Sequence, residues 1–364
     1  MRLSQLIGTL ETWAPPTLQE DYDNSGLQVG DPAKEVSSAL VALDCTEAVV
    51  AEAVRRKCDV IICHHPVIFR GLKSLTGRTG VERTLLAAIK YDVAVYAIHT
   101  NLDNVISGVN SEIGARLGLH ELKVLQPLTG RLRKLVTFVP TAYVEAVRAA
   151  LFQAGAGRIG NYDECSFGAE GAGTFRPGQG TDAFVGKVGE RHTEAEIRLE
   201  TIFPVERQRA VVASLLAAHP YEEVAYDVIA LANDHPGIGA GAIGSLPAPV
   251  PEEEFLARLK AVFNTPMVKH TAPIGRAISR VAVCGGSGAF LVERAKAAGA
   301  DAYVTADLKY HEYFGAEGQI LIADIGHFES EQYTMHLIQR YLRDKLPTFA
   351  AHLTETVTNP VHIC

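Results

Sequence analysis

The sequence lacks the features that mark membrane, secreted or nucleic-acid-binding proteins. Its 364 residues contain no apolar run near the roughly 20 residues that a bilayer-spanning helix needs, and no basic-then-apolar segment opens the chain. Lys and Arg number 34 against 42 Asp and Glu, and the net charge of −8 argues against a nucleic acid as partner. Six cysteines without CxxC spacing favour reduced thiols over disulfides or a thiolate zinc site. We therefore expect a cytoplasmic protein without a membrane partner.

What the sequence does contain is an alternation of strand and helix patterns that occurs twice. The first series has strands at 39–43, 60–63 and 93–98 with helices at 47–57 and 81–90; the second has strands at 281–284, 302–305 and 320–325 with helices at 289–298 and 310–316. Such βαβ series predict a mostly parallel sheet. The expected fold class is therefore α/β, with a core built from two related halves.

The alternation breaks between the two series. Patterns at 135–139, 144–154, 196–203, 205–218 and 226–229 form two strand–helix units and a final strand, which is typical of an inserted α+β domain of the ferredoxin-like type. Residues 168–189 are rich in Gly and short polar side chains, so they should form loops or a hairpin. We predict a core domain of residues 1–127 and 232–364 and an inserted domain of residues 128–231.

Two histidines stand side by side where a buried strand is predicted to end. Neighbouring side chains of a strand point to opposite faces, so His64 and His65 can serve one site only if the backbone leaves strand geometry there. Pro66 favours this, because it ends ladder pairing and holds His65 extended.

A His-x3-carboxylate pair follows the third predicted strand of each half. His99 with Asp103 and His327 with Glu331 share a face wherever a helical turn begins at the histidine. Ligands of open α/β sheets gather beyond the carboxyl ends of the strands. We therefore expect both pairs to meet the two neighbouring histidines at one rim.

This set has too many ligands for one tetrahedral ion and suits two. The hypothesis is that two divalent metal ions, chosen among Zn, Fe, Mn and Co, are held by His64, His65, Asp103, His327 and Glu331. His99 either binds metal itself or holds Asp103 in place. Two dications outweigh two carboxylates, which predicts an anionic ligand such as a phosphate. Water held between two such ions becomes a nucleophile at neutral pH, which is the use hydrolases make of such a site.

Several polar residues near this rim allow both a structural and a functional interpretation. Asp23 and Asn24 belong to a DNSG stretch that is typical of a turn, or they contact the site or its substrate. Asp307 either caps a helix or lies at the rim, because it aligns with His65 in the repeat. Lys309 would then meet a phosphate.

Two further residues are candidates for moving protons. His311 is either part of an ordinary helix start or a proton carrier, and Glu329 is either a solvated helix residue or a catalytic group. The run at 285–288, Gly-Gly-Ser-Gly, either cradles an anion at a helix N-terminus or simply forms a tight turn.

The order of six segments resembles a known family. These segments are DYDNSGLQVG (21–30), ICHHPVIFRGLKSL (62–75), AIHTNLDN (97–104), VAVCGGSG (281–288), TADLKYHEY (305–313) and IGHFESEQY (325–333). They are similar to the GTP cyclohydrolase 1 type 2-like family, also called Nif-three-like, whose members have a dinuclear metal centre. GAGRIGNYDECSF (154–167), GTFRPGQG (173–180) and HPYEEVAYDV (219–228) resemble the insertion of its long bacterial form.

The resemblance implies more than the spacing does. It implies an insertion like PII or CutA proteins and a toroidal homohexamer with metal centres facing the interior cavity. The metal ligands of the family correspond to the same five residues that the spacing indicates, which are His64, His65, Asp103, His327 and Glu331.

Two functions are compatible with this sequence. The first is a metal-dependent hydrolase acting on a nucleotide or other phosphorylated substrate, with opening of the guanine ring of GTP as the reaction that the resemblance suggests. The second is a non-enzymatic hexamer for metal handling or partner regulation, whose insertion senses a small ligand. Metal-dependent turnover that is lost on replacing His64 and Glu331 by Ala would distinguish the two.

Overall fold

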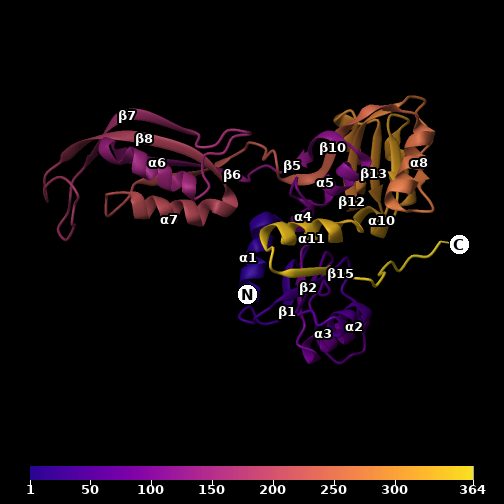
Figure 1. Cartoon of the computed structure of the whole chain (residues 1–364). Coiled ribbons are helices and arrows are strands. Elements are labelled where there is room, and N and C mark those ends of the chain that lie inside the picture. The colour runs from indigo at the N-terminus through magenta and orange to yellow at the C-terminus, as the bar shows by residue number, and fades with distance from the viewer. Residues whose placement is uncertain (364) are drawn as a thin grey trace. The chain divides into compact units, whose positions relative to one another are not determined.

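The structure is a computed structural model that describes residues 1–363, and the chain forms two compact units (Figure 1). Unit 1 consists of Met1–Pro127 and the chain from Gly237 onward, and unit 2 is Leu128–Pro236. Unit 2 extends past the end of its last strand, β9, as far as Pro236, whereas the predicted insertion ends at residue 231. Both units are mixed α/β.

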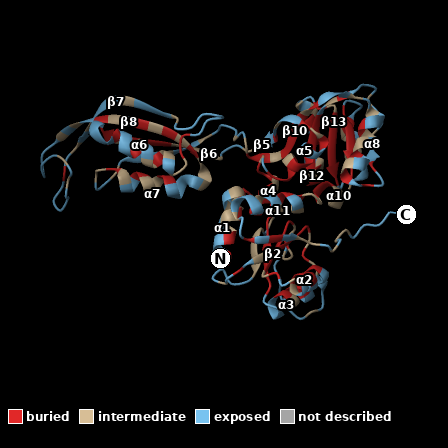
Figure 2. Cartoon of the chain, in the orientation of Figure 1, coloured by how far each residue is buried: buried red, intermediate tan, exposed pale blue. Residues whose placement is uncertain are grey.

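The first sheet of unit 1 has five strands in the order β1-β4-β3-β2-β15. Their bounds are β1 Gly26–Val29, β2 Ser38–Ala42, β3 Val60–Cys63, β4 Ala94–Ala97 and β15 Ala350–Leu353. Only β1 is antiparallel to its neighbour, so this sheet is mostly parallel, as expected. Every residue of β3 and β4 is buried, which is typical of parallel strands covered on both faces. The neighbouring strand β2 is labelled in Figure 2, where buried residues are red. Helices α2 (Glu47–Arg55) and α3 (Gly80–Lys90) contribute to the core beside them.

The second sheet of unit 1 is mixed, which differs from the expectation. Its order is β11-β14-β13-β12-β10-β5, with bounds β5 His120–Pro127, β10 Gly239–Val250, β11 Lys269–His270, β12 Ile278–Ser287, β13 Ala302–Ala306 and β14 Leu321–Asp324. Only β12, β13 and β14 are parallel to one another. From Gly239 on, the glycine-rich run that follows the insertion is part of β10, and a Cβ at Gly239 would overlap the carbonyl oxygen of Gln126 on β5. Glycine therefore lets β10 approach β5 closely.

Each sheet of unit 1 contains three consecutive parallel strands, β2-β3-β4 in the first and β12-β13-β14 in the second, and both triples begin in the same way. Asp59, which precedes β3, accepts hydrogen bonds from the backbone N–H groups of Ser37 and Ser38 at 2.7 and 3.1 Å. Asp301, which precedes β13, accepts them from Ser279 and Arg280 at 3.0 and 2.9 Å. In both triples a carboxylate before the second strand therefore fixes the start of the first.

Unit 2 is a four-stranded antiparallel sheet with two helices. The strands are β6 Leu132–Pro140, β7 Ser166–Phe175, β8 His192–Pro204 and β9 Tyr226–Leu231, in the order β7-β8-β6-β9, and the helices are α6 Val144–Gln153 and α7 Gln208–Ala218. Leu135 of β6 and Leu199 of β8 pack with Val147 of α6 and Val211 of α7. Residues 168–175 pair with β8 as a long hairpin, which was one of the two forms expected for the glycine-rich stretch.

Short helices connect and cover these sheets. They are α1 Leu3–Trp13, η1 Pro16–Leu18, α4 Thr100–Asp103, α5 Val109–Leu117, η2 Thr141–Tyr143, η3 Val205–Arg207, α8 Glu252–Phe263, η4 Ala289–Leu291, α9 Val292–Ala297, η5 Tyr310–Ala316, α10 His327–Glu331 and α11 Thr334–Lys345. Within residues 1–363, no helix is both long and apolar enough to cross a membrane.

Candidate metal centre

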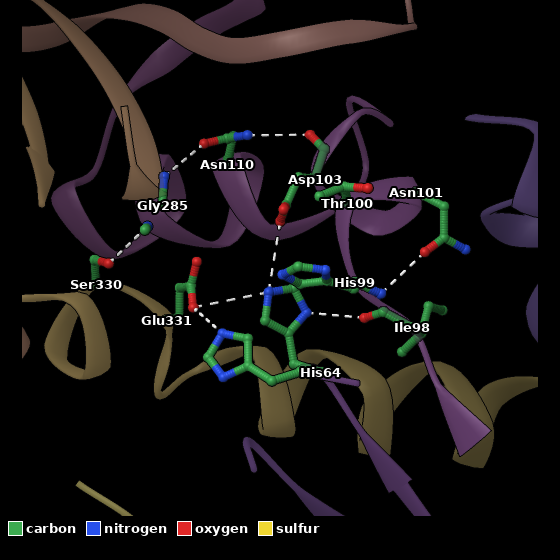
Figure 3. Close-up of polar contacts among 12 residues, drawn as sticks. His64, Ile98, His99, Thr100, Asn101, Asp103, Asn110, Gly285, Ser330 and Glu331 are labelled. Carbon is green, nitrogen blue, oxygen red and sulfur yellow. Dashed lines mark hydrogen bonds and ion pairs between the residues drawn. The ribbon is translucent and has the colours of Figure 1, made fainter. Parts of the chain in front are cut away.

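Polar side chains from the ends of parallel strands converge in unit 1 (Figure 3). His64 and His65 follow β3, His99 follows β4 and begins the short helix α4 that ends at Asp103. Helix α10 follows β14 of the second sheet and starts at His327. The fold thus brings both His-x3-carboxylate pairs and the histidine pair to one place.

Each of the four histidines is held through its Nδ1 atom. The partners are the carbonyl oxygen of Ile98 for His64 (2.8 Å), and carboxylate oxygens of Asp44 for His65 (2.8 Å), Asp23 for His99 (2.7 Å) and Asp307 for His327 (2.7 Å). A carbonyl or carboxylate oxygen can only accept, so Nδ1 carries the proton in each ring. The lone pair that can bind a metal ion is then on Nε2, which is the arrangement found around metal-binding histidines.

The Nε2 atoms gather around the carboxylate of Glu331. Its Oε2 atom lies 2.9 Å from Nε2 of His65, 3.0 Å from Nε2 of His327 and 3.8 Å from Nε2 of His64. The Nε2 atoms of His65 and His327 are themselves 3.2 Å apart. Glu331 is buried and central to the cluster.

Two buried atoms of the cluster have no partner within the described chain. Nε2 of His64 and Oδ1 of Asp103 are both without a hydrogen bond, and they lie 3.7 Å apart. Leaving such atoms buried and unpaired costs free energy. A nitrogen and a carboxylate oxygen that face each other at this distance are a donor set for a cation, which each would contact at about 2 Å. The residues present therefore fit a metal ion.

Burial and charge set the protonation of the cluster. Burial, and then the charge of Glu331, raise the pKa of Asp103 to about 7. Burial also acts to raise the pKa of Glu331, but the imidazoles of His64 and His327 outweigh it and hold this pKa well below its ordinary value. Burial acts to lower the pKa of His65, yet its hydrogen bonds to Asp44 and Glu331 raise it to about 10. The cluster thus stabilises positive charge at its centre.

Among residues 1–363, three overlapping groups of side chains could hold a metal ion, with ligand atoms within 4.8 Å of one another. They are His64, His65 and His99; His65, His327 and Glu331; and His64, Asp103 and Glu331. Glu331 belongs to two of them. The ring of His99 belongs to one and bonds the carboxylate of Asp23.

Asp23 contacts one histidine of the cluster, His99, whereas the side chain of Asn24 bonds elsewhere. Asp23 accepts hydrogen bonds from His99, from the Thr100 hydroxyl and from the backbone N–H of Thr100. Burial acts to raise its pKa, but these bonds outweigh burial and keep the pKa far below the ordinary value. Asn24 instead donates from Nδ2 to the carbonyl oxygen of Ile68 at 2.6 Å. Asp23 is therefore positioned to orient His99.

Of the remaining predicted residues, only Asp307 contacts a histidine of the cluster. It has a positive φ of 58° directly after β13, and its carboxylate bonds His327. Lys309 and His311 are exposed, and the His311 ring packs against Phe314. The carboxylate of Glu329 accepts a hydrogen bond from Asn359 at 2.9 Å. Catalytic roles for His311 and Glu329 stay predictions.

The sequence reasoning missed Asp44, the partner of His65. Asp44 follows the end of β2 at the same spacing as His65 follows the end of β3, so its place after a strand was a usable signal. Thr358 donates to its other oxygen at 2.5 Å. Burial acts to raise the pKa of Asp44, but the bonds from His65 and Thr358 keep it below its ordinary value.

The glycine-rich run at 285–288 is mostly the end of β12, and it serves the cluster in another way than by binding an anion. The N–H groups of Gly285 and Gly286 donate to side-chain oxygens of Asn110 and Ser330, both at 3.0 Å, so neither is free for an anion (Figure 3). A Cβ at Gly286, where φ is +60°, would overlap Oε1 of Glu331. Gly286 therefore provides the space that this carboxylate occupies.

Comparison with known proteins gives consistent matches over the whole chain. Residues 1–360 match the family described as Duf34/NIF3 (NGG1p interacting factor 3). Proteins named GTP cyclohydrolase 1 type 2 homolog from Halalkalibacterium halodurans and Bacillus subtilis are each 39% identical over 362 residues, which is 98% of this chain and 96% and 97% of theirs. A Bacillus cereus crystal structure described as related to NIF3 is 36% identical with a TM-score of 0.88, over 100% of this chain and 99% of that one. These matches span both units.

Proposed function

The chain belongs to the Duf34/NIF3 family, and on this premise we propose that it is a hydrolase that uses two divalent metal ions to act on a nucleotide or another phosphorylated substrate. The observation that carries the proposal is a pair of buried atoms without a hydrogen-bond partner in the described chain, Nε2 of His64 and Oδ1 of Asp103. They lie beside the shared carboxylate of Glu331.

Two ions are supported by how the ligands divide. His64 and Asp103 form one group with Glu331, and His65 and His327 form another with the same carboxylate. Imidazole with carboxylate suits Zn, Fe, Mn or Co. When bound, such a pair of ions acidifies water and neutralises the charge of a phosphate.

The protein side chains supply orientation. Asp44 and Asp307 fix the rings of His65 and His327, and Asp23 fixes His99, so the ligands are arranged before the substrate enters. We propose that Glu329 and His311 carry protons between the cluster and solvent. Their variants would lower turnover and leave the metal content unchanged.

Side chains beside the cluster suit a nucleotide. The Phe69 ring lies 6.3 Å from that of His99, and Tyr22 lies 6.3 Å from Phe69, both with much of their surface exposed. Such rings can stack on a planar base. Arg70 and Lys73 follow Phe69 in an exposed segment and are available to meet phosphates. GTP is the first substrate to test, because the relatives are named for GTP cyclohydrolase.

We also propose that unit 2 is a ferredoxin-like domain, that the protein is a homohexamer and that it is cytoplasmic. The element order βαββαβ and strand order β7-β8-β6-β9 support a ferredoxin-like domain of the PII/CutA kind in unit 2. A homohexamer would cover exposed apolar side chains such as Phe290, Tyr310 and Phe314, and sedimentation velocity tests it. Free thiols at the five described cysteines suit the cytoplasm.

The test compares the metal-loaded wild type with Glu331→Gln, which keeps the shape and removes the shared charge. Glu317→Gln is the matched control, because Glu317 is exposed and its carboxylate pairs, within residues 1–363, with Lys296 and Gln319. GTP and a panel of phosphoesters are the substrates. We expect turnover in the wild type and the control, and a loss of at least about 100-fold in Glu331→Gln. Equal rates in all three proteins would refute the hydrolase and favour the metal-handling alternative.

A further inference from the structure

Unit 2 contains a cavity of about 650 Å³ whose lining includes no residue of the metal cluster. Its volume is in the range of small-molecule sites. It lies between the face of the sheet that points away from α6 and α7, the connection after β7, and the segment around Tyr221. A ligand could bind here whether or not the metal cluster of unit 1 is a hydrolase.

Small residues of β7 form the floor of this cavity. Gly171 pairs with Glu196 of β8, and Ala169 pairs with Arg198, on the face opposite to Leu199, which packs with the helices. A Cβ at Gly173 would overlap the carboxylate of Glu196. The small residues of β7 therefore leave space above this part of the sheet, and the Glu196 side chain lies flat against Gly173.

Three aromatic rings form the wall. The ring of Tyr221 lies 5.9 Å from that of Phe175 and 6.0 Å from that of Phe184, between centroids. The backbone N–H of Asp182 bonds the carboxylate of Glu222 at 3.1 Å, which ties the connection after β7 to the segment around Tyr221. The aromatic side chains are thus held close together around one space.

A buried carboxylate faces the same space. Glu196 is 8% exposed, and its Oε1 atom accepts a hydrogen bond from the Tyr221 hydroxyl at 2.8 Å. Within residues 1–363, no hydrogen bond or ion pair engages its Oε2 atom. The neighbouring cation, Arg198, pairs with Glu200 at 2.9 Å instead. Glu196 is therefore a buried negative charge without a positive partner in the described chain.

Acidic side chains outnumber basic ones in the lining of the cavity. The lining carboxylates are those of Glu170, Glu196, Glu222 and Glu223, and the lining cations are Arg176 and Arg198. An anionic ligand would be repelled by Glu196, and a purely apolar ligand would leave its carboxylate desolvated without compensation. A metal ion would find no imidazole or thiolate in this lining.

We propose that this cavity binds an organic cation, an ammonium group on an apolar body, with Glu196 as counter-ion and the rings of Phe175, Phe184 and Tyr221 as walls. Aromatic faces attract cations, and cages of two or three rings with a carboxylate are used for ammonium ligands elsewhere. The small floor of β7 would accept the apolar part of the ligand.

The test uses choline and its neutral carbon isostere, 3,3-dimethyl-1-butanol, titrated into the full chain by calorimetry and by ligand-observed NMR. We expect choline to bind at least tenfold more tightly than the isostere. Glu196→Gln keeps the shape and the acceptor for Tyr221 and should weaken choline binding at least tenfold. Glu190→Gln, an exposed change in the same connection outside the lining, should have no effect.

A second variant guards against misfolding. Gly171→Leu removes no hydrogen bond, and a Cβ there has its nearest neighbour at 3.9 Å, so the side chain would fill the cavity without disturbing the backbone. It should abolish choline binding while the melting temperature stays near that of the wild type. The proposal would be overturned if choline did not bind, or if it bound no more tightly than the isostere. It would also be overturned if Glu196→Gln and Gly171→Leu bound choline as tightly as the wild type does.

Discussion

The Nε2 atom of His64 and the Oδ1 atom of Asp103 face each other at 3.7 Å, both buried and both without a hydrogen-bond partner in the described chain. His64 is fixed by the carbonyl oxygen of Ile98, and the main chain of Asp103 is fixed by Asn110, which donates to its carbonyl oxygen at 3.1 Å. The ring of His64 cannot turn away to find another partner without breaking its bond to Ile98. The pair is therefore arranged for a third atom.

Removal of metal should destabilise the protein. A chelator would leave the buried His64 and Asp103 atoms without a hydrogen-bond partner, so the melting temperature should fall by several degrees. Adding Zn²⁺ or Mn²⁺ should restore it, as measured by calorimetry. Ca²⁺ should not, because it prefers all-oxygen sites. A melting temperature insensitive to chelator would contradict metal binding at this cluster.

Asp44 should be a positioning residue for metal binding. Asp44→Asn removes the charge that holds His65 Nδ1, so metal affinity measured by competition with a fluorescent chelator should fall about 10- to 100-fold. Thr358→Val removes only the hydroxyl that holds Asp44 and should have a smaller effect of the same sign. Asp31→Asn, at an exposed turn, serves as the control. Unchanged affinity in Asp44→Asn would show that the His65 contact is structural only.

Gly286→Ala should displace the Glu331 carboxylate. The added Cβ would overlap Oε1 of Glu331 at a position with φ of +60°. Gly299→Ala is the matched control, because φ is +74° there and nothing lies within 4 Å, so its cost should be only the backbone strain of about 1 kcal/mol.

Urea unfolding and metal analysis separate the two effects. Gly286→Ala should lose more unfolding free energy than Gly299→Ala and should also lose metal, whereas the control should retain metal. Equal metal content in both variants would mean that Glu331 can move without loss of the site.

Glu52 should make stability depend on acid pH. It is buried in α2, and Thr354, Thr356 and the backbone N–H of Glu355 donate to its carboxylate. Burial acts to raise its pKa, but these bonds lower it from 4.5 to about 2. The folded state therefore favours the charged form, which stabilises fully above about pH 4.5 and is lost as pH falls toward 2.

Glu52→Gln tests this linkage. The difference in unfolding free energy between wild type and variant should be largest near pH 7 and should shrink steadily as pH falls from 4.5 to about 2. Glu355→Gln is the control, because Glu355 is exposed and its carboxylate makes only long ion pairs with Arg55 and Arg56 in the described chain. A difference that does not change with pH would show that Glu52 stabilises through shape and not through charge.

The sequence predicts the convergence of the cluster well, because strand ends are local features. His64 and His327 each follow a strand that its apolar run identifies, and parallel pairing then places such ends on one side of a sheet. The i,i+4 spacing of His327 and Glu331 predicts their shared helical turn, which is α10.

What the sequence did not reveal depends on contacts between distant segments. Asp44 serves His65 only because β2 lies beside β3, and Thr358 reaches Asp44 from the far end of the chain. The mixed character of the second sheet has the same origin, since β10 becomes part of it by pairing antiparallel with β5 and β12, and β5 precedes the insertion in the chain. Local patterns contain none of this information.

The pairing of β5 with β10 has a consequence for how unit 2 can change. Pro127, the last residue of β5, pairs with Gly239, the first residue of β10. The chain therefore leaves the second sheet of unit 1 and re-enters it at two directly paired residues. A short hairpin turn would close that gap as well as the whole insertion does. Residues 128–236 are thus free to be exchanged, enlarged or dispensed with as one module, while every histidine and carboxylate of the metal centre keeps its place in the remaining chain.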